Sequence, residues 1–298
     1  MSVKDRRGDR IIPITYEPQE EFKDNSQKES MILTVVSNGS YEFELNNNRY
    51  KKQAPFILCL TNKDKIELKS KEGYCSAASF SFSPLFINSA LTEEALEKNS
   101  FNHIEDMHDS NLMLMFRYHM EDFDGLIMLD YFSSLKVNEW VGIMGSETLS
   151  QSDGMWTCRI RRYLLQLLYL LEDSYYELKN GQKEQKDTVE IVMEFIHTHY
   201  HQGILLQDLC QYANVNRTTL NEAFKKRTGV TVMHYLADYR IKMAKTTLTH
   251  TNLKLSEIAV CCGYNYETYF MQQFSKKVGL TPSEYREKKL EEKFGKSS

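Results

Sequence analysis

The 298-residue sequence predicts an α+β protein of two domains, in which an antiparallel β domain is followed by an all-helical domain. Three observations lead to this fold class. Residues 31–82 are rich in β-branched and aromatic residues and are interrupted by turn residues. The hydrophobic spacing becomes helical after Pro84, and the last third of the chain contains an internal repeat.

The N-terminal domain is expected to contain six strands. They cover Met31–Val36, Tyr41–Leu45, Arg49–Gln53, Phe56–Leu60, Lys65–Lys69 and Tyr74–Phe82. Breaks are expected at Asn38-Gly39, at Asn46-Asn47-Asn48 and at Gly73, because asparagine and glycine tolerate the left-handed backbone conformation. Short strands at this spacing predict a small antiparallel barrel or sandwich.

A long helix is expected from Trp156 to about Leu178. Its inward stripe at helical spacing consists of Leu164, Leu168, Leu171 and Tyr175. Other apolar residues widen this stripe over most of the circumference, which is more than one barrel can cover. We therefore expect the helix to pack partly against its own barrel and partly against a second copy, with those four residues at the dimer contact. The alternative is a helix buried entirely within its own domain.

A linker is expected at residues 179–187, which contain a glycine and polar residues but no apolar anchor. The domains are then 1–178 and 188–298. Residues 1–186 carry 22 Lys and Arg against 29 Asp and Glu, a net charge of −7, whereas residues 187–298 carry 15 against 12, a net charge of +3. The basic excess is modest, and by itself it indicates only two differently charged surfaces.

Several functional classes find no support in the sequence. No apolar run approaches the roughly 20 residues of a membrane span, and the charged start lacks the apolar stretch of a signal peptide, so we expect a cytoplasmic protein. No GxSxG motif, phosphate loop or GxGxxG motif occurs, so we expect neither an enzyme nor a cofactor. The six cysteines are scattered without CxxC spacing, which disfavours a zinc or disulfide framework.

A metal site is also disfavoured. No histidine precedes His103, so the strand region lacks the imidazole ligands of a metal-binding barrel. His197 and His201 would share one face of a helix, but an ordinary helix end explains them more simply.

The internal repeat places two similar units about 50 residues apart. Leu206–Cys210 aligns with Leu255–Ala259, and Phe224–Gly229 aligns with Phe274–Gly279, with one residue added in the second unit. Each unit reads as a helix, a turn and a second helix.

The turns have residues that suit this arrangement. Asn214 and Gly263 can adopt the left-handed conformation that ends the first helices, 206–213 and 255–262. Asn216 and Asn265 are expected to cap the second helices.

In the second helices, buried residues at i and i+4 fix which side chains face outward. The buried pairs are Leu220 with Phe224 and Phe270 with Phe274, and Gly229 and Gly279 end the helices. The outward residues of the first unit are Arg217, Thr218, Asn221, Glu222 and Lys225. Those of the second unit are Tyr266, Glu267, Thr268, Met271, Gln272 and Lys276.

One continuous helix, residues 232–247, is expected between the units. Its inward residues are Tyr235, Leu236, Tyr239, Met243 and Ala244, and its basic residues Arg240, Lys242 and Lys245 are expected to face solvent or phosphate. Such a rigid spacer would present both outward helices to one face of a DNA duplex, in major-groove turns ~34 Å apart.

Residues 205–286 resemble the DNA-binding domain of AraC/XylS-type transcriptional regulators. The second half carries the more specific pattern, Gly-Tyr-x4-Tyr-Phe-x3-Phe-x4-Gly-Leu-Thr-Pro-x2-Tyr-Arg, from Gly263 to Arg286. In the first half the matching positions are Leu220, Phe224-Lys225, Gly229, Tyr235, Arg240, Ala244 and Leu248. The N-terminal domain resembles the cupin-like effector domain of the family only in strand rhythm and position.

The resemblance implies a transcription factor that responds to a ligand, usually an activator, which acts as a homodimer on promoter DNA and engages RNA polymerase. Phosphate contacts are expected from Lys225, Lys226, Arg240, Lys245, Lys276 and Lys277. Base contacts are expected from Arg217, Thr218, Asn221, Tyr266, Glu267, Met271 and Gln272. Glu222 departs from the family pattern, since this position is often basic there, and its carboxylate would repel phosphate.

The resemblance also implies that the barrel binds a small-molecule effector, such as a sugar or related metabolite. Aromatic and basic residues on the expected strands are the candidates for a pocket: Tyr41, Phe43, Arg49, Tyr50, Phe80 and Phe82. The rival hypothesis keeps DNA binding but has the N-terminal domain only dimerise or respond to a protein partner.

Overall fold

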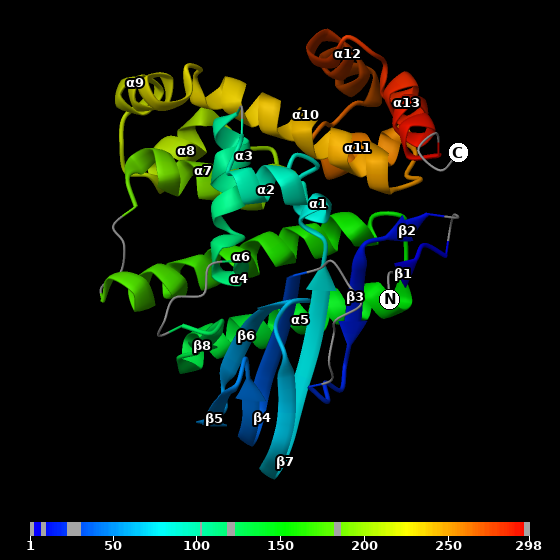
Figure 1. Cartoon of the computed structure of the whole chain (residues 1–298). Helices are drawn as coiled ribbons and strands as arrows, with labels where there is room; N and C mark the ends of the chain where they lie inside the picture. Colours follow the sequence, from blue (N-terminus) through cyan, green and yellow to red (C-terminus); the bar gives the residue numbers. More distant parts are fainter. Residues whose placement is uncertain are drawn as a thin grey trace.

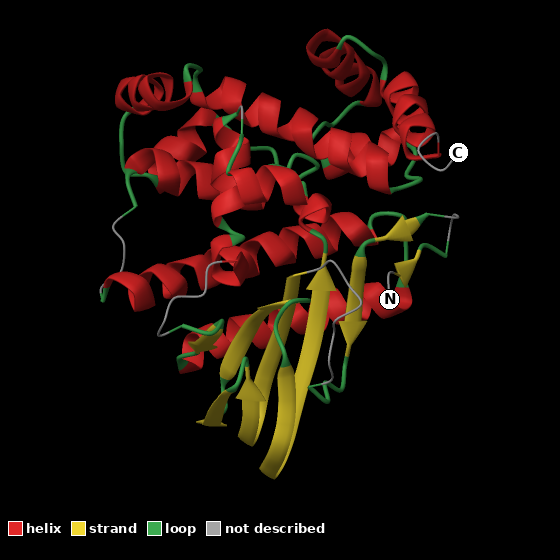
Figure 2. Cartoon of the chain, in the orientation of Figure 1, coloured by secondary structure: helices red, strands yellow, loops and turns green. Residues whose placement is uncertain are grey.

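The computed structural model describes residues 3–6, 10–22, 31–101, 103–117, 123–181 and 186–294. An antiparallel sheet lies at one end of the molecule and a layer of helices at the other, with two long helices between them (Figure 1). Strands are confined to the N-terminal half, and the C-terminal part consists of helices and loops (Figure 2). The predicted α+β class is confirmed.

Eight strands make up the β structure. They are β1 (Val3–Lys4), β2 (Ile11–Ile12), β3 (Ile14–Glu17), β4 (Met31–Leu45), β5 (Asn48–Gln53), β6 (Phe56–Thr61), β7 (Ile66–Phe82) and β8 (Leu126–Met128). The main sheet has the order β3-β7-β4-β6-β8, and β5 also pairs with β4. Within the described residues, no pairing joins β3 to β8, so the sheet is open and forms no closed barrel, and the predicted cupin-like barrel is not confirmed.

Two expected breaks lie inside continuous strands. Asn38-Gly39 forms an irregularity within β4, where the register against β7 shifts, instead of a hairpin turn. Gly39 has a φ of +95°, and a β-carbon there would lie 2.4 Å from the sulfur of Cys75, so glycine lets the paired strands bend together. Gly73 likewise lies within β7. Only the asparagine turn behaves as predicted: Asn46 and Asn47 adopt positive φ and join β4 to β5.

Thirteen helices occur in the described residues. In the N-terminal region they are α1 (Pro84–Ile87), α2 (Glu93–Lys98), α3 (Ile104–Asn111), α4 (Leu114–Arg117), α5 (Tyr131–Ser150) and α6 (Trp156–Asn180). In the C-terminal region they are α7 (Thr188–His199), α8 (Leu206–Tyr212), α9 (Arg217–Thr228), α10 (Val232–His250), α11 (Leu255–Cys261), α12 (Glu267–Val278) and α13 (Pro282–Phe294). No helix among these described residues is long and apolar enough to cross a bilayer.

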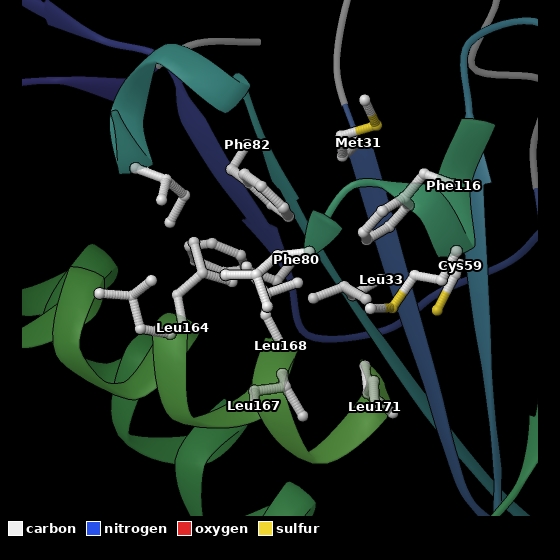
Figure 3. Close-up of a cluster of buried hydrophobic side chains, with 14 of the residues drawn as sticks. Met31, Leu33, Cys59, Phe80, Phe82, Phe116, Leu164, Leu167, Leu168 and Leu171 are labelled. Atoms are coloured by element: carbon white, nitrogen blue, oxygen red, sulfur yellow. The ribbon is translucent and has the colours of Figure 1, made fainter. Parts of the chain in front are cut away.

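The main core of the N-terminal region lies between one face of the sheet and helices α5 and α6. Figure 3 shows leucines of α6 directed at Leu33, Phe80 and Phe82 of the strands. A second buried cluster, which includes Phe43 and Phe56, lies elsewhere on the bent sheet.

The four residues predicted to form a dimer contact are buried in this core. Leu164, Leu168 and Leu171 have no exposed surface, and Tyr175 is 3% exposed. The dimer prediction for them is therefore wrong, and the helix buried within its own region is the observed alternative. The physical reason is that the open sheet offers α6 a full apolar face, which α5 extends.

The C-terminal region has a core of its own, built around α10. This helix contacts α9, α11, α12 and α13, and its predicted inward residues are buried. Of the expected linker, residues 182–185 lie outside the described residues. Helix α7 begins directly afterwards with a capping box, in which Asp187 and Glu190 bond reciprocally to backbone amides.

Candidate DNA-binding surface

The first helix pair, α8 and α9, is formed as predicted. Asn214 has a φ of +52°, and the side chain of Asn216 accepts a 2.9 Å hydrogen bond from the backbone amide of Thr219. Leu220 and Phe224 are fully buried. Helix α9 is thereby fixed on the core through one face, and its other face is left to solvent.

The second pair, α11 and α12, differs at the cap. Gly263 has a φ of +77°, and a β-carbon there would lie 2.4 Å from the carbonyl oxygen of Tyr200, so only glycine fits. The N-cap of α12 is Tyr266, which makes no side-chain capping bond. The prediction of Asn265 as the cap is wrong, because the residue added in this turn moves the helix start by one position.

The outward faces of α9 and α12 carry most of the predicted contact residues. Exposed side chains on α9 are Arg217, Thr218, Glu222, Lys225 and Lys226, and Asn221 is half-buried. At and along α12, Tyr266, Glu267, Thr268, Gln272, Lys276 and Lys277 are exposed, and Met271 is half-buried. Figure 1 shows both helices on the side of the molecule remote from the sheet, joined by α10.

The basic side chains on these helices are not equivalent. Lys225, Lys226 and Lys276 make no ion pair with any described residue. Lys277 forms an ion pair with Asp238 of α10 and a 2.7 Å hydrogen bond with His234. The first three are therefore the cations most available to a DNA phosphate.

Two other predicted phosphate contacts lie in more internal positions. Arg240 donates to the carbonyl oxygens of Tyr200, at 2.8 Å, and Gln202, at 2.6 Å, and its burial lowers its pKa. Lys245 is half-buried, and burial lowers its pKa as well. Arg240 thus ties the end of α7 to α10, and its contact with phosphate stays a prediction.

Two basic residues have roles that sequence reasoning missed. Arg227, at the end of α9, pairs with Asp187 at 2.5 Å and Glu190 at 2.6 Å, which fastens α9 to the start of α7. Lys242 was expected to face solvent but is buried against α3. The Asp187-x-x-Glu190 spacing is a signal for a helix start, but nothing local indicates the distant arginine.

The predicted effector residues do not form one site. Phe80 and Phe82 are buried in the main core against α6, whereas Tyr41 and Phe43 are buried in the second cluster. Tyr50 packs against the second cluster through a stacked contact with Phe43. Arg49 is exposed and pairs with Glu42 on the neighbouring strand. The two clusters lie on opposite faces of the sheet, because successive residues of β6 alternate between them. Register shifts within β4 change which face its later residues take, so simple alternation along the strand could not place Tyr41 and Phe43.

The expected histidine pair also separates. His197 is fully buried, and His201 lies against Arg162, at 3.3 Å between Nε2 and Nη1. No group of three or more His, Cys, Asp or Glu side chains suited to a metal ion occurs among the described residues.

Comparison with known proteins agrees with the helix-pair geometry. A family model described as a helix-turn-helix domain matches residues 209–288, from α8 into α13. The chain is similar to the lactose operon transcription activator of Staphylococcus xylosus, with 28% identity over 185 residues, 57% of this chain and 66% of that protein. It is similar to the HTH-type transcriptional activator RhaR of Enterobacter sp. (strain 638), with 31% identity over 122 residues, 41% of this chain and 43% of that protein.

A solved structure, the C-terminal domain of the response regulator yesN from Fusobacterium nucleatum, is 32% identical over 33% of this chain and 95% of that chain, with a TM-score of 0.32. The chain spans less than two thirds of the length of the curated relatives named above. The similarity to activators and the matched helix-turn-helix residues agree with the motif from Gly263 to Arg286. The C-terminal domain is therefore similar to the helix-turn-helix domain of AraC/XylS-type transcriptional regulators.

Proposed function

We propose that the protein is a sequence-specific DNA-binding transcriptional regulator, an activator, that binds promoter DNA as a homodimer and engages RNA polymerase. The observation that carries the proposal is the pair of outward faces on α9 and α12, two helices that α10 connects. On these faces polar side chains lie beside Lys225, Lys226 and Lys276, which form no ion pair with a described residue. Each helix pair acts as a helix-turn-helix motif, with α9 and α12 as the recognition helices.

Polar side chains on the two faces provide the sequence reading. Asn221 and Gln272 have the paired donor and acceptor that adenine requires, and Arg217 suits guanine. The lysines set affinity and its dependence on salt without regard to sequence. Glu222 is exposed on α9, so the first motif would accept a hydrogen bond from cytosine but lose attraction to phosphate.

Selection of binding sites from a random duplex pool tests this proposal. Asn221→Ala and Gln272→Ala are expected to relax the preference at separate base pairs, each by about 1–3 kcal/mol. Gln53→Ala, at the exposed end of β5, is the matched control and should leave the preference unchanged. An unchanged preference in both test variants would show that these side chains do not read the bases.

The N-terminal region, with residues 1–178 as its domain and 179–187 as the linker to residues 188–298, is proposed to bind a small-molecule effector. Support comes from the resemblance and from the relatives' names, which include an activator of a lactose operon. A metabolite at 100 times its dissociation constant should raise the stability of the full chain by ~2.7 kcal/mol, which a thermal-shift screen can detect.

In a second candidate function, the N-terminal region contacts a protein instead of binding a small molecule. Exposed apolar residues on α5 favour this candidate. Phe132 and Leu135 are exposed by 75% and 51% and share one helix face with Lys136 and Glu139. Antiparallel pairing of two copies along this face would set Lys136 of each copy opposite Glu139 of the other. Sedimentation of the full chain and of a Phe132→Asp, Leu135→Asp variant tests this face: a dimer that persists in the variant excludes it.

A further inference from the structure

Two cysteines that are far apart in the sequence meet where α6 packs on α11. Cys158 lies in the first turn of α6, and Cys261 is the last residue of α11. Cys158 packs against the buried cluster of the C-terminal region, which includes Cys261 and Cys262. The thiols of Cys158 and Cys261 are in hydrogen-bonding contact, and neither cysteine forms a disulfide. We call these two residues the thiol pair.

Packing at the start of α6 holds the thiol pair together. Gly154 lies just before the helix, and a β-carbon there would lie 2.8 Å from Glu257 Oε1 on α11 and 2.8 Å from Leu253 Cδ2. Met155, the N-cap of α6, packs against the same C-terminal cluster as Cys158. The turn that begins α6 therefore lies directly on α11. This close approach fixes the position of Cys158 beside the end of α11.

A buried cation lies beside the thiol pair. Arg161 follows Cys158 by one helical turn and has no exposed surface. Its Nε donates to the carbonyl oxygen of Phe86 at 2.7 Å, and its Nη1 donates to the hydroxyl of Thr247 at 3.0 Å. Among the described residues, its Nη2 has no hydrogen-bond partner and no carboxylate forms an ion pair with it. A buried guanidinium without a counter-charge favours a negative charge on a neighbouring group, and Cys158 is such a neighbour.

The two thiols differ in their tendency to ionise. Met155 makes no side-chain capping bond, so the positive end of the α6 dipole is left to act on Cys158. The hydrogen bond from Cys261 lowers the pKa of Cys158, and Arg161 lowers it further, against the opposing effect of burial. The same hydrogen bond, together with burial, raises the pKa of Cys261. Cys158 is thus the better nucleophile, and it is also the less buried of the two.

We propose that the thiol pair is an oxidation site for hydrogen peroxide, at which a reversible disulfide joins α6 to α11. The Cys158 thiolate attacks one peroxide oxygen and the O–O bond breaks, which gives a sulfenic acid at Cys158 and, after protonation, water. The sulfur of Cys261 then attacks the sulfenic sulfur. The S–O bond breaks, and the departing hydroxide takes the proton of Cys261 to form a second water. The thiols are oxidised by two electrons, the peroxide is reduced to water, and an added dithiol reverses the oxidation by thiol–disulfide exchange.

Mapping of the disulfide in the reduced full chain tests the proposal. The protein is exposed briefly to hydrogen peroxide, the remaining thiols are alkylated in urea, and the peptides are analysed by mass spectrometry without reductant. We expect two of the six thiols to become protected, in a linked peptide that contains Cys158 and Cys261 and that dithiothreitol separates. The oxidised protein should run as a single chain in denaturing electrophoresis without reductant, because the bond lies within one chain.

Single substitutions identify the role of each thiol. Cys261→Ser keeps a hydroxyl near Cys158 but cannot form a disulfide, so oxidation should stop at a sulfenic acid, which dimedone traps at Cys158. Cys158→Ser should give neither the linked peptide nor an adduct at Cys261. Cys262→Ser, beside Cys261, and Cys210→Ser, at a half-buried position on α8, are the matched controls and should leave the linked peptide unchanged. Circular dichroism checks that each variant is folded, and the map of the wild-type chain does not depend on them.

The opposite results are equally distinct. Retention of all six thiols at a peroxide excess that oxidises free cysteine overturns the proposal. So does a linked peptide that pairs Cys261 with Cys262, a disulfide between two chains, or a sulfenic acid trapped on Cys261 instead of Cys158. None of these measurements uses DNA, so the proposed regulatory function stands or fails separately.

Discussion

Two asparagines at equivalent places in the repeat have different roles. Asn216 accepts a hydrogen bond from the amide of Thr219 and so satisfies a free donor at the start of α9. Asn265 lies one residue before the N-cap of α12, and that cap, Tyr266, makes no side-chain bond. A sequence alignment assigns both the same function, whereas the one-residue insertion gives it to only one of them.

This difference predicts unequal effects of alanine. Asn216→Ala should lower the free energy of unfolding by about 1 kcal/mol, because an amide of α9 loses its acceptor. Asn265→Ala should have little effect, and Asn216→Ser should retain most of the stability. Urea denaturation of the three variants measures this, and an equal loss at both asparagines would contradict the capping assignment.

A buried histidine makes stability depend on pH. Burial, with a contribution from neighbouring His197, lowers the pKa of His108 to about 3, and its Nε2 atom has no hydrogen-bond partner among the described residues. In the unfolded chain the pKa is about 6.5. Between these values the unfolded chain binds a proton that the folded chain does not, so stability falls as the pH falls below about 6.5.

We therefore expect the free energy of unfolding to decrease on acidification by up to about 1.4 kcal/mol per pH unit for this histidine, with His197 adding to the slope. His108→Gln should remove its share. Urea unfolding of both proteins between about pH 7 and pH 5 provides the slopes. If wild type and His108→Gln show the same slope of unfolding free energy against pH, His108 binds its proton equally well in the folded and the unfolded chain.

At the scale of elements, the helices of the C-terminal region were the most predictable part of the chain. Their hydrophobic spacing, their left-handed turn residues and their terminal glycines are local signals, and α8 to α12 occur close to where these signals place them. The sheet was less predictable. Asn38-Gly39 has the composition of a hairpin turn, but pairing along β7 continues past it and converts it into a bend.

The location of α6 shows a similar limit. Its apolar circumference was read correctly, but the sequence could not say whether the sheet or a second copy covers it. Packing against the open sheet predicts that Leu168→Ala lowers the free energy of unfolding by about 2–5 kcal/mol, because a buried leucine leaves a cavity. The exposed Leu135→Ala, on α5, should cost far less.

Denaturation across a range of protein concentrations checks this prediction. Because Leu168 is buried within one chain, the destabilisation should be independent of concentration. A loss that grows on dilution would instead indicate that Leu168 takes part in an interface between copies.

At the scale of the whole molecule, the candidate site combines residues of two kinds. The outward faces of α9 and α12 follow from helical geometry alone, and they are exposed where the pattern places them. The contacts of Arg240 and Lys242 could not be predicted from the sequence, because their partners lie far away along the chain: Tyr200 at the end of α7 for Arg240, and α3 for Lys242. A basic residue on an amphipathic helix has the same local pattern whether it faces DNA, solvent or another part of the chain.

The salt dependence of DNA binding separates these two kinds of basic residue. Each lysine that neutralises a phosphate adds roughly 0.9 to the slope of log affinity against log salt, so Lys225→Ala or Lys276→Ala should reduce the slope by about that amount. Arg240→Met should leave the slope nearly unchanged, because its guanidinium is used by the carbonyl oxygens of Tyr200 and Gln202. It should lower stability instead, since the carbonyl oxygens of Tyr200 and Gln202 lose a charged donor. Fluorescence anisotropy with one duplex over a salt series gives the slopes, and urea unfolding gives the stabilities. A slope reduced by Arg240→Met, with stability unchanged, would mean that this arginine leaves its internal partners and contacts phosphate when DNA binds.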